Sequence, residues 1–365
     1  MSETALSHHR WMNIALMAAS QIIGHTADNP PVGCAIINKD GELVGVGHTA
    51  AGGRPHAETQ ALAQAGEAAR GGQAYVTLEP CAHQGKTPPC APGLIAAGVS
   101  AVHIAIGDPD MRVSGKGIAM LEQAGIHTSV GIGEAQATYQ MAGFLSRQTR
   151  NRPFVRLKMA SSADGFIAKE DGKQTWLTGA ISRRYVHDMR SRHDVILTGA
   201  GTLKADNPQL NVRLHGWHNS QPDLAILSRK ASFPKECQAL HQDRLVRLYH
   251  QEDCQLSALP ASIMAKPVAG DETGLSLEAV LRDLAINGYG QLMVEAGAKL
   301  AQSLIEANLI DELVWIQAPH KLEAGIKAWK VADHLDFSAP DGYIKRKEFM
   351  LGADKVRIFQ PDNRA

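Results

Sequence analysis

Helical and extended apolar patterns alternate along most of this chain, and this alternation constrains its fold more than any other feature. An amphipathic stretch near the N-terminus precedes a hairpin pattern, in which two apolar runs flank a Lys-Asp-Gly turn. An Ala-rich helical pattern then alternates with the strand patterns QAYVTLEPC and SAVHIAIGDP. Strands that alternate with helices fold into layered α/β domains, so we expect a largely parallel sheet beyond the hairpin.

A polar segment interrupts this pattern in the middle of the chain. Residues 146–153 contain three arginines and end in a proline, which predicts a linker at 148–153. The segment separates a first domain at 1–147 from a second at 154–365, and the total of 365 residues fits two domains of ordinary size. The second domain repeats the alternation, with strand patterns such as HDVILTGAG and YGQLMVEAG.

Charge and hydropathy argue against several classes of partner. Lys and Arg total 37, and Asp and Glu also total 37. The chain therefore lacks the excess of basic residues that would favour a nucleic-acid polymer as its partner. No apolar run approaches the length of a membrane span, and the N-terminal stretch lacks the basic leader and cleavage site of a signal peptide. Five cysteines in a chain of this size indicate a reducing, cytoplasmic compartment, where special cysteines bind metal rather than form disulfides.

One cluster of residue types predicts a zinc site. The tetrapeptide PHAE places His56 and Glu58 at the start of a helix, and EPCAHQGKTPPC places Cys81 and Cys90 on either side of a loop. One imidazole and two thiolates make three ligands and leave the fourth position open for water, which is the arrangement of catalytic zinc. Helix N-termini favour the thiolate form of cysteine, so both cysteines suit this role.

Glu58 completes a deaminase signature. It lies two residues past the predicted ligand His56, within reach of a zinc-activated water, and would pass the water proton to a departing amine. The order H-x-E followed by P-C-x-x-C is the signature of zinc deaminases, although eight residues rather than two separate the cysteines here. A single HAE or a single buried cysteine is commonplace, and only the combination predicts hydrolysis of an exocyclic amine from a nucleobase-like ring.

The second domain has a weaker signal for a dinucleotide. No G-x-G-x-x-G opens a helix after a strand, but ILTGAGTLKADNPQLNVR and LMVEAGAKLAQSLIEA each run from a strand through glycine into a helix. A helix N-terminus of this kind offers free N–H groups to a phosphate. Ordinary strand–turn–helix glycines explain the same pattern, and the residues alone leave both interpretations open.

The string AYVTLEPCAHQGKTPPC, with NPPVGCAI before it and IGDPDMRVSGKG after it, resembles the bifunctional deaminase/reductase family of bacterial riboflavin biosynthesis. The resemblance covers nearly the whole chain. It implies a cytidine-deaminase-like α/β/α layered domain followed by a dihydrofolate-reductase-like α/β domain. It also implies one catalytic Zn²⁺, NADPH, phosphorylated pyrimidine substrates and a homodimer or higher homo-oligomer.

In the first domain, the resemblance implies that the substrate contacts Asn29, His83 and Lys86. His83 and Lys86 lie in the loop between two predicted zinc ligands, and Lys86 would meet the substrate phosphate as a point charge. Asn29 precedes Pro30, so a simple turn residue is an equally good explanation for it.

In the second domain, the resemblance implies two sets of contacts. The substrate set is Gln174, Arg190, Leu210, Arg213 and Glu295, with Gln174 standing where the family usually has serine. The cofactor set is Ala160, Trp176, Thr202, Asp206, Ser228, Gly297, Ala298, Lys299, Leu300, Ala301, Gln302 and Ser303. Two arginines would bind the ribose phosphate as a fork, although a solvated helix face is the plainer explanation for Arg190.

The implied activity has two steps. Zinc-dependent hydrolysis removes an amine from 2,5-diamino-6-(5-phosphoribosylamino)pyrimidin-4-one, and NADPH then reduces the ribosyl group to ribityl. Two other functions stay open at this point. In the first, the chain is a plain deaminase that acts on a nucleoside or tRNA, and its second domain serves assembly. In the second, the second domain binds a nucleotide as a sensor or scaffold and has no turnover.

Overall fold

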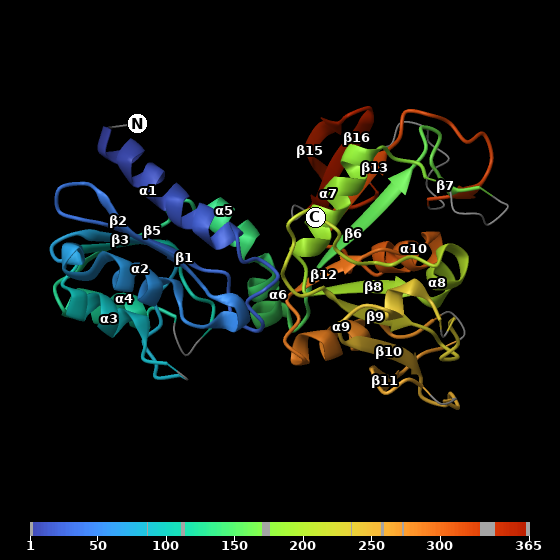
Figure 1. The fold of residues 1–365 in the computed structure, drawn as a ribbon, viewed down its shortest axis with the longest axis horizontal. Helices are drawn as coiled ribbons and strands as arrows, with labels where there is room; N and C mark the ends of the chain where they lie inside the picture. The colour runs from blue at the N-terminus through green and yellow to red at the C-terminus, as the bar shows by residue number, and fades with distance from the viewer. Residues whose placement is uncertain are drawn as a thin grey trace. The chain divides into compact units, whose positions relative to one another are not determined.

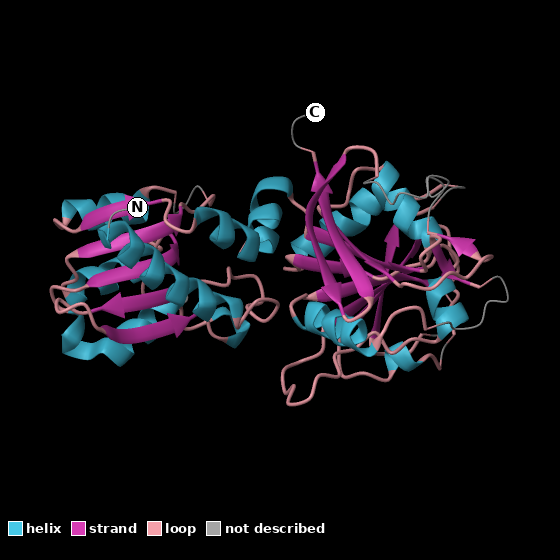
Figure 2. Ribbon diagram, turned by 90° about the horizontal axis from the view of Figure 1, so that it is seen from above, coloured by secondary structure: helices cyan, strands magenta, loops and turns pink. Residues whose placement is uncertain are grey.

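The structure, a computed structural model, describes residues 3–85, 87–110, 114–169, 176–234, 236–256, 259–271, 274–328 and 340–362. It divides into two compact units, Met1–Arg152 and Pro153–Ala365, and each unit has its own sheet (Figures 1 and 2). Among the described residues, no helix combines the length and apolar character needed to cross a membrane.

The first unit is a five-stranded sheet with helices packed against it. Its strand order is β2-β1-β3-β4-β5, in which β1 pairs antiparallel with β2 and β3, and the pairs β3–β4 and β4–β5 are parallel. The expected hairpin and the parallel strands beyond it are therefore confirmed. The elements are α1 (Glu3–Ser20), β1 (Gly33–Ile37), β2 (Leu43–His48), α2 (Ala57–Ala65), β3 (Gln73–Leu78), α3 (Cys90–Ala97), β4 (Ala101–Ile106), α4 (Lys116–Gln123), β5 (His127–Val130), α5 (Glu134–Gln140) and α6 (Ala142–Arg150).

Glycines in the hairpin allow helices to approach both of its faces. A Cβ on Gly33 would clash with the backbone of α1 at Ala15, and a Cβ on Gly47 would clash with the carbonyl oxygen of Ala57 in α2. Gly33 pairs with His48, whereas Gly47 pairs with Cys34, so the two glycines face opposite sides of the sheet. The start of α2 therefore lies directly on the backbone of β2.

The predicted linker at 148–153 overlaps a helix. Helix α6 continues to Arg150, and its Ser146 hydroxyl donates to the carbonyl oxygen of Arg152 at 2.8 Å. Residues 148–150 are thus helical rather than part of an irregular connection. Two of the three arginines, Arg147 and Arg150, lie in α6, which is amphipathic, and its polar residues were interpreted as part of a loop.

The second unit is built on a nine-stranded sheet of order β11-β10-β9-β8-β12-β6-β13-β16-β15. The strands from β11 to β13 are parallel, and β16 and β15 add an antiparallel edge. The elements are β6 (Phe154–Ser161), β7 (Phe166–Ala168), α7 (Ala180–Ser191), β8 (Val195–Gly199), α8 (Ala200–Asp206), β9 (Asp223–Leu227), β10 (Val246–Gln251), β11 (Ile263–Val268), α9 (Leu277–Ile286), β12 (Gln291–Val294), α10 (Ala298–Glu306), β13 (Glu312–Gln317), β14 (Ile326–Lys327), β15 (Tyr343–Leu351) and β16 (Asp354–Pro361).

The strand order reverses at the centre of this sheet. From β6 the chain moves outward through β8, β9, β10 and β11, and then returns to insert β12 between β8 and β6. In open parallel sheets, ligands bind outside the carboxyl ends of the strands at such a reversal. This topology positions a site beyond the ends of β6, β8 and β12.

Candidate active sites

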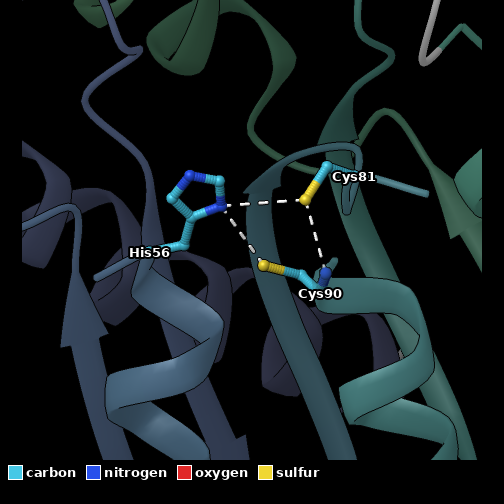
Figure 3. Close-up of side chains that lie close together, drawn as sticks. All are labelled: His56, Cys81 and Cys90. Atoms are coloured by element: carbon cyan, nitrogen blue, oxygen red, sulfur yellow. Dashed lines mark hydrogen bonds between the residues drawn. The ribbon is translucent and has the colours of Figure 1, made fainter. Parts of the chain in front are cut away.

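Three ligand residues of the first unit come from the ends of regular elements. His56 is the N-cap of α2, Cys81 follows β3, and Cys90 is the first residue of α3. The backbone N–H of Ala91 donates to the carbonyl oxygen of Cys81 at 3.1 Å, which ties the start of α3 to the end of β3. Two helix starts and one strand end therefore meet at this cluster (Figure 3).

The distances between the three side chains fit one zinc ion. The His56 Nδ1 atom lies 3.3 Å from Cys90 Sγ and 3.7 Å from Cys81 Sγ, and all three ligand atoms lie within 4.8 Å of one another. Zinc–ligand bonds of tetrahedral zinc sites imply separations of about 3.5 Å between a nitrogen and a sulfur ligand. The separations therefore suit zinc, and Nδ1 is the His56 nitrogen that lies close to both sulfur atoms.

Without metal, the two cysteines share protons unequally. The pKa of Cys81 falls to about 4, because the Cys90 thiol, His56 and the Cys90 backbone N–H (3.3 Å) all donate hydrogen bonds to its sulfur. The pKa of Cys90 is raised, because its thiol donates to Cys81 and because it is buried. The pKa of His56 is raised by its hydrogen bond to Cys81. The cluster thus favours the thiolate at Cys81, and the thiolate is the form of cysteine that binds a metal ion.

Glu58 lies buried in the first turn of α2, with 4% of its surface exposed. Burial raises the pKa of its carboxyl, and the nearby Cys81 charge raises it further. Burial raises the pKa of the Cys34 thiol on β1, and the nearby charge of Glu58 raises it further. A carboxyl held beside the metal cluster with a raised pKa suits proton transfer.

The three deaminase residues implied by the resemblance have different surroundings. His83 is exposed in the loop between Cys81 and Cys90, and Lys86 lies outside the described residues. Asn29 lies in a turn: its carbonyl oxygen accepts from the Thr26 hydroxyl at 2.6 Å, and its amide donates to Asp28 Oδ1 at 3.0 Å. The turn interpretation of Asn29 therefore describes its contacts, and its contact with substrate stays a prediction.

Arg54 is a cation at this site that the sequence interpretation missed. Its guanidinium donates to the Thr87 hydroxyl in the loop between the two cysteines, and its charge opposes the rise in the pKa of His56 that the hydrogen bond to Cys81 causes. The signal was its place in the sequence GRPHAE, two residues before a predicted metal ligand.

The second unit contains a cavity of about 1460 Å³ at the strand reversal. The resemblance implies substrate and cofactor contacts in this unit, and all but two of those that the structure describes line the cavity. The lining members are Ala160, Trp176, Arg190, Thr202, Asp206, Leu210, Arg213, Ser228, Glu295, Gly297, Ala298, Lys299, Leu300 and Ser303. The exceptions are Ala301, which packs in the core, and Gln302, whose amide donates to Glu306. Gln174 lies outside the described residues.

A buried carboxylate organises the charges at the base of this cavity. Arg190 donates to both carboxylate oxygens of Glu295, with Nη2 at 2.9 Å from Oε2, and Lys158 Nζ lies 3.6 Å from Oε2. Burial opposes the ionisation of Glu295, but the charges of Arg190 and Lys158 prevail and lower its pKa to about 2. The side chain of Arg190 is only 11% exposed, so the solvated-face explanation for it is wrong.

Arg213 and His187 extend the basic surface from Arg190. The Nη1 atom of Arg190 donates to the carbonyl oxygen of Asn211 at 3.0 Å, and His187 Nδ1 lies 3.0 Å from the same oxygen. Burial and the charges of Arg190 and Arg213 lower the pKa of His187 to about 4. The cavity therefore presents two guanidinium groups beside a neutral imidazole, which suits a phosphate.

The glycine turn before α10 lies on the cofactor side of the cavity. Gly297 is the N-cap of α10, and its N–H donates to the Thr202 hydroxyl at 3.2 Å. Trp176 is 64% exposed, with the Arg183 guanidinium 5.2 Å from its ring centroid. Burial raises the pKa of Asp206, and the charge of Lys158 opposes that rise. The free N–H groups at the start of α10 suit a pyrophosphate.

Several lining residues were missed, although their spacing carried a signal. Lys158 lies two positions before Ala160 on β6, and side chains two apart on a strand share a face. Arg183 and His187 share a face of α7 with Arg190, at the i, i+4 and i+7 spacing of a helix. Both periodicities were visible in the sequence.

Two family models match the chain. The model of the RibD C-terminal domain matches residues 153–324, and the model of the cytidine and deoxycytidylate deaminase zinc-binding region matches residues 6–106.

Full-length relatives match as well. The riboflavin biosynthesis protein RibD of Haemophilus influenzae is 40% identical over 323 residues, which is 86% of each chain. The RibD of Escherichia coli is 35% identical over 93% of this chain and 95% of its own.

Solved structures agree over nearly the whole length. Acinetobacter baumannii RibD superposes with a TM-score of 0.86 at 33% identity, covering 98% of this chain and all of the other. A diaminohydroxyphosphoribosylaminopyrimidine deaminase/5-amino-6-(5-phosphoribosylamino)uracil reductase from Thermotoga maritima gives a TM-score of 0.87 at 30% identity with the same coverage.

Proposed function

Because this chain belongs to the RibD family of riboflavin biosynthesis proteins, we propose that the zinc cluster and the cavity divide the family's two reactions between residues 1–147 and 154–365. The enzyme is a bifunctional zinc-dependent deaminase and NADPH-dependent reductase. The predicted fold class, a cytidine-deaminase-like layered domain followed by a dihydrofolate-reductase-like domain, is confirmed. The plain-deaminase and sensor alternatives are excluded by this membership.

The deaminase step acts on 2,5-diamino-6-(5-phosphoribosylamino)pyrimidin-4-one and releases ammonia. When bound, zinc acts as a Lewis acid that makes water a nucleophile near neutral pH. We assign its ligands to His56 Nδ1, Cys81 Sγ and Cys90 Sγ. The observation that supports this assignment is the 4.8 Å cluster of these atoms beside the buried Glu58.

Glu58 would move the proton of this reaction. Its carboxylate takes a proton from the attacking water and gives it to the departing nitrogen, which leaves as ammonia. Burial keeps the carboxyl away from bulk solvent, and the raised pKa brings its affinity for a proton closer to what the transfer needs. Asn29, His83 and Lys86 are the proposed contacts with the pyrimidine and its phosphate.

The reductase step converts the ribosyl group to ribityl and gives 5-amino-6-(5-phosphoribitylamino)uracil. When bound, NADPH supplies the hydride, and the protein provides orientation and charge. Glu295 fixes Arg190 and Lys158 at the base of the cavity, and Arg190 and Arg213 would bind the ribose phosphate. Lys158 Nζ would give a proton to the ring oxygen as the sugar ring opens.

The proposal also covers the compartment and the oligomeric state of the protein. All five cysteines are free thiols, which supports a reducing, cytoplasmic location. The proposed assembly is a homodimer or higher homo-oligomer formed through the second unit. Sedimentation equilibrium measures the oligomeric state.

An assay that follows both products tests the assignment. Purified enzyme with zinc, the diaminopyrimidine phosphate and NADPH should release ammonia first and then oxidise NADPH. Without NADPH, ammonia release should persist and 5-amino-6-(5-phosphoribosylamino)uracil should accumulate. Ammonia without NADPH oxidation would contradict the reductase assignment, and neither signal would contradict both.

A further inference from the structure

The loop after α8 carries two proposed substrate contacts in an unusual backbone conformation. Leu210 has φ of +45°, a left-handed conformation that a leucine rarely adopts, while its side chain is only 3% exposed. Asn207, at the start of the loop, is also left-handed, with φ of +42°. Such conformations persist only where the surroundings enforce them, and they concentrate at functional sites.

Side chains bind the carbonyl oxygens of four consecutive residues of this loop, 209–212. Arg190 Nη1 binds that of Asn211, and Gln221 Nε2 binds that of Val212 at 3.1 Å. The remaining two, those of Gln209 and Leu210, both accept from Arg244. This loop has no strand or helix partner to satisfy its backbone, so these side chains determine its course.

Arg244 joins three separate segments through one guanidinium. Its Nη2 donates to the carbonyl oxygens of Gln209 (3.0 Å) and Ala239 (2.7 Å), and its Nη1 donates to those of Leu210 (2.5 Å) and Pro222 (3.2 Å). Burial lowers its pKa to about 10, with a further contribution from the charge of Arg190. A rigid, planar group with several donors is suited to this task, and a lysine is not.

Side chains of the loop residues in turn orient Arg213. The Nη1 atom of Arg213 donates to Gln209 Oε1 at 2.7 Å and to Asn211 Oδ1, and its backbone N–H donates to His187 Nδ1 at 3.3 Å. A shift of residues 209–211 would therefore move the Arg213 guanidinium directly. Arg244 itself does not line the cavity, so it acts on the site only through this loop.

We infer that Arg244 is a positioning residue of the reductase site, which holds the loop at 209–211 so that Arg213 meets the ribose phosphate. The inference rests on the proposed role of Arg213 in substrate binding. It extends the site beyond the residues that touch the cavity and makes substrate affinity depend on a turn before β10.

The test measures reductase kinetics of the full-length enzyme with 5-amino-6-(5-phosphoribosylamino)uracil. Replacing Arg244 by alanine (R244A) should raise KM for this substrate about tenfold, because charged hydrogen bonds to the loop are lost. The kcat, the KM for NADPH and ammonia release should each stay within about twofold of wild type, since the loop binds phosphate rather than taking part in the chemistry. Guanidinium ions added at millimolar concentration should restore KM. R244K should show the same raised KM for this substrate, and it provides the test if R244A does not fold.

Two matched variants separate the possible outcomes. R192A removes an exposed arginine that pairs with Asp188 on α7, and it should leave all constants unchanged. R213A removes the proposed phosphate contact and should raise the same KM. If R213A raises this KM and neither R244A nor R244K does, the positioning role of Arg244 alone is overturned. No effect of R213A would overturn the proposed phosphate contact, and the inference with it. A rise in the KM for NADPH equal to that for substrate would also overturn the inference.

Discussion

The zinc cluster takes its three ligands from between positions 56 and 90, whereas the cavity of the second unit is lined from positions 158 to 326. In the first case, helix starts and one strand end bring the ligands together within a short stretch of chain. In the second, β6, α7, α8, α10 and the residues after β12 each contribute side chains to the cavity, and Lys158 and Arg190 pair with Glu295 at its base. The residues of the zinc cluster can therefore be recognised from a short sequence motif, whereas the lining of the cavity depends on the order of the strands in the sheet. The two sites should therefore respond separately to substitution.

The largest expected effect is the loss of a zinc ligand. C90S should abolish zinc binding and ammonia release, because a site with three protein ligands cannot retain its metal firmly with two. NADPH oxidation with added 5-amino-6-(5-phosphoribosylamino)uracil should be unchanged. Zinc content by atomic absorption and the two activities are measured side by side. C254S is the matched control in the second unit, and a parallel loss of reductase activity in C90S would break the separation.

The next effect concerns proton transfer. E58Q should keep zinc at wild-type stoichiometry but lower the rate of ammonia release by about 10³-fold, a typical contribution of a positioned acid–base group. The amide keeps the size of the side chain and cannot accept the water proton. Ammonia release near the wild-type rate would show that another group carries the proton.

In the second unit, Lys158 should matter for the chemical step. K158M should lower the kcat for NADPH oxidation by about 10²-fold, because the proposed proton donor is removed and Glu295 loses one of its two cations. Ammonia release should not change. K204M is a control at the cavity wall on α8, and it should keep kcat within about twofold. Equal kcat values for K158M and wild type would contradict the role of Lys158.

The smallest expected effect is on stability. His193 is buried between Arg156 Nη1 (2.8 Å from its Nε2) and the carbonyl oxygen of Met189, and burial followed by the Arg156 charge lowers its pKa to about 3. The unfolded state, with a pKa near 6.5, binds the proton more readily. The contribution of His193 to the free energy of unfolding is therefore fully present above the unfolded pKa of about 6.5. It is lost as the pH falls towards 3, and about 1–2 kcal/mol is lost between pH 7 and 5.

Calorimetric unfolding at several pH values checks this prediction. H193N should lose this part of the pH dependence in the transition of the second unit. The same slope in H193N and wild type would assign the acid sensitivity to other groups.

The sequence predicted the three residues that the structure brings together in the cluster, because each begins or follows an element with a visible signal, and their binding of zinc stays a prediction. His56 and Cys90 stand at helix starts, and Cys81 ends an apolar run. The fourth feature, the burial of Glu58, follows from its place on the inner face of the same helix. The residue types and their order were sufficient here, although the contact joins separate elements, with His56 and Cys90 34 positions apart.

For the second site, the residues alone indicated two glycine turns that could hold a phosphate, and the roles of single residues came from the family resemblance. Nothing in the local pattern around Glu295 indicates that it binds Arg190 on another element, because that contact depends on β12 lying beside β8. Several strands were also missed, among them β10, β11, β15 and β16. Of these, β11 and β15 lie at sheet edges and expose polar side chains, as Lys345 and Lys347 do, so their apolar alternation is weak.

The late return of β12 to the centre of its sheet also has a consequence for the order of events during synthesis. The first unit pairs its strands nearly in the order in which they leave the ribosome, whereas β6 and β8 must wait for β12 to fill the space between them. At ordinary rates of translation the wait from β6 to β12 is on the order of ten seconds, with the facing strand edges unpaired. The nascent deaminase unit can fold during that interval, and the reductase unit is the part of the chain most in need of a chaperone.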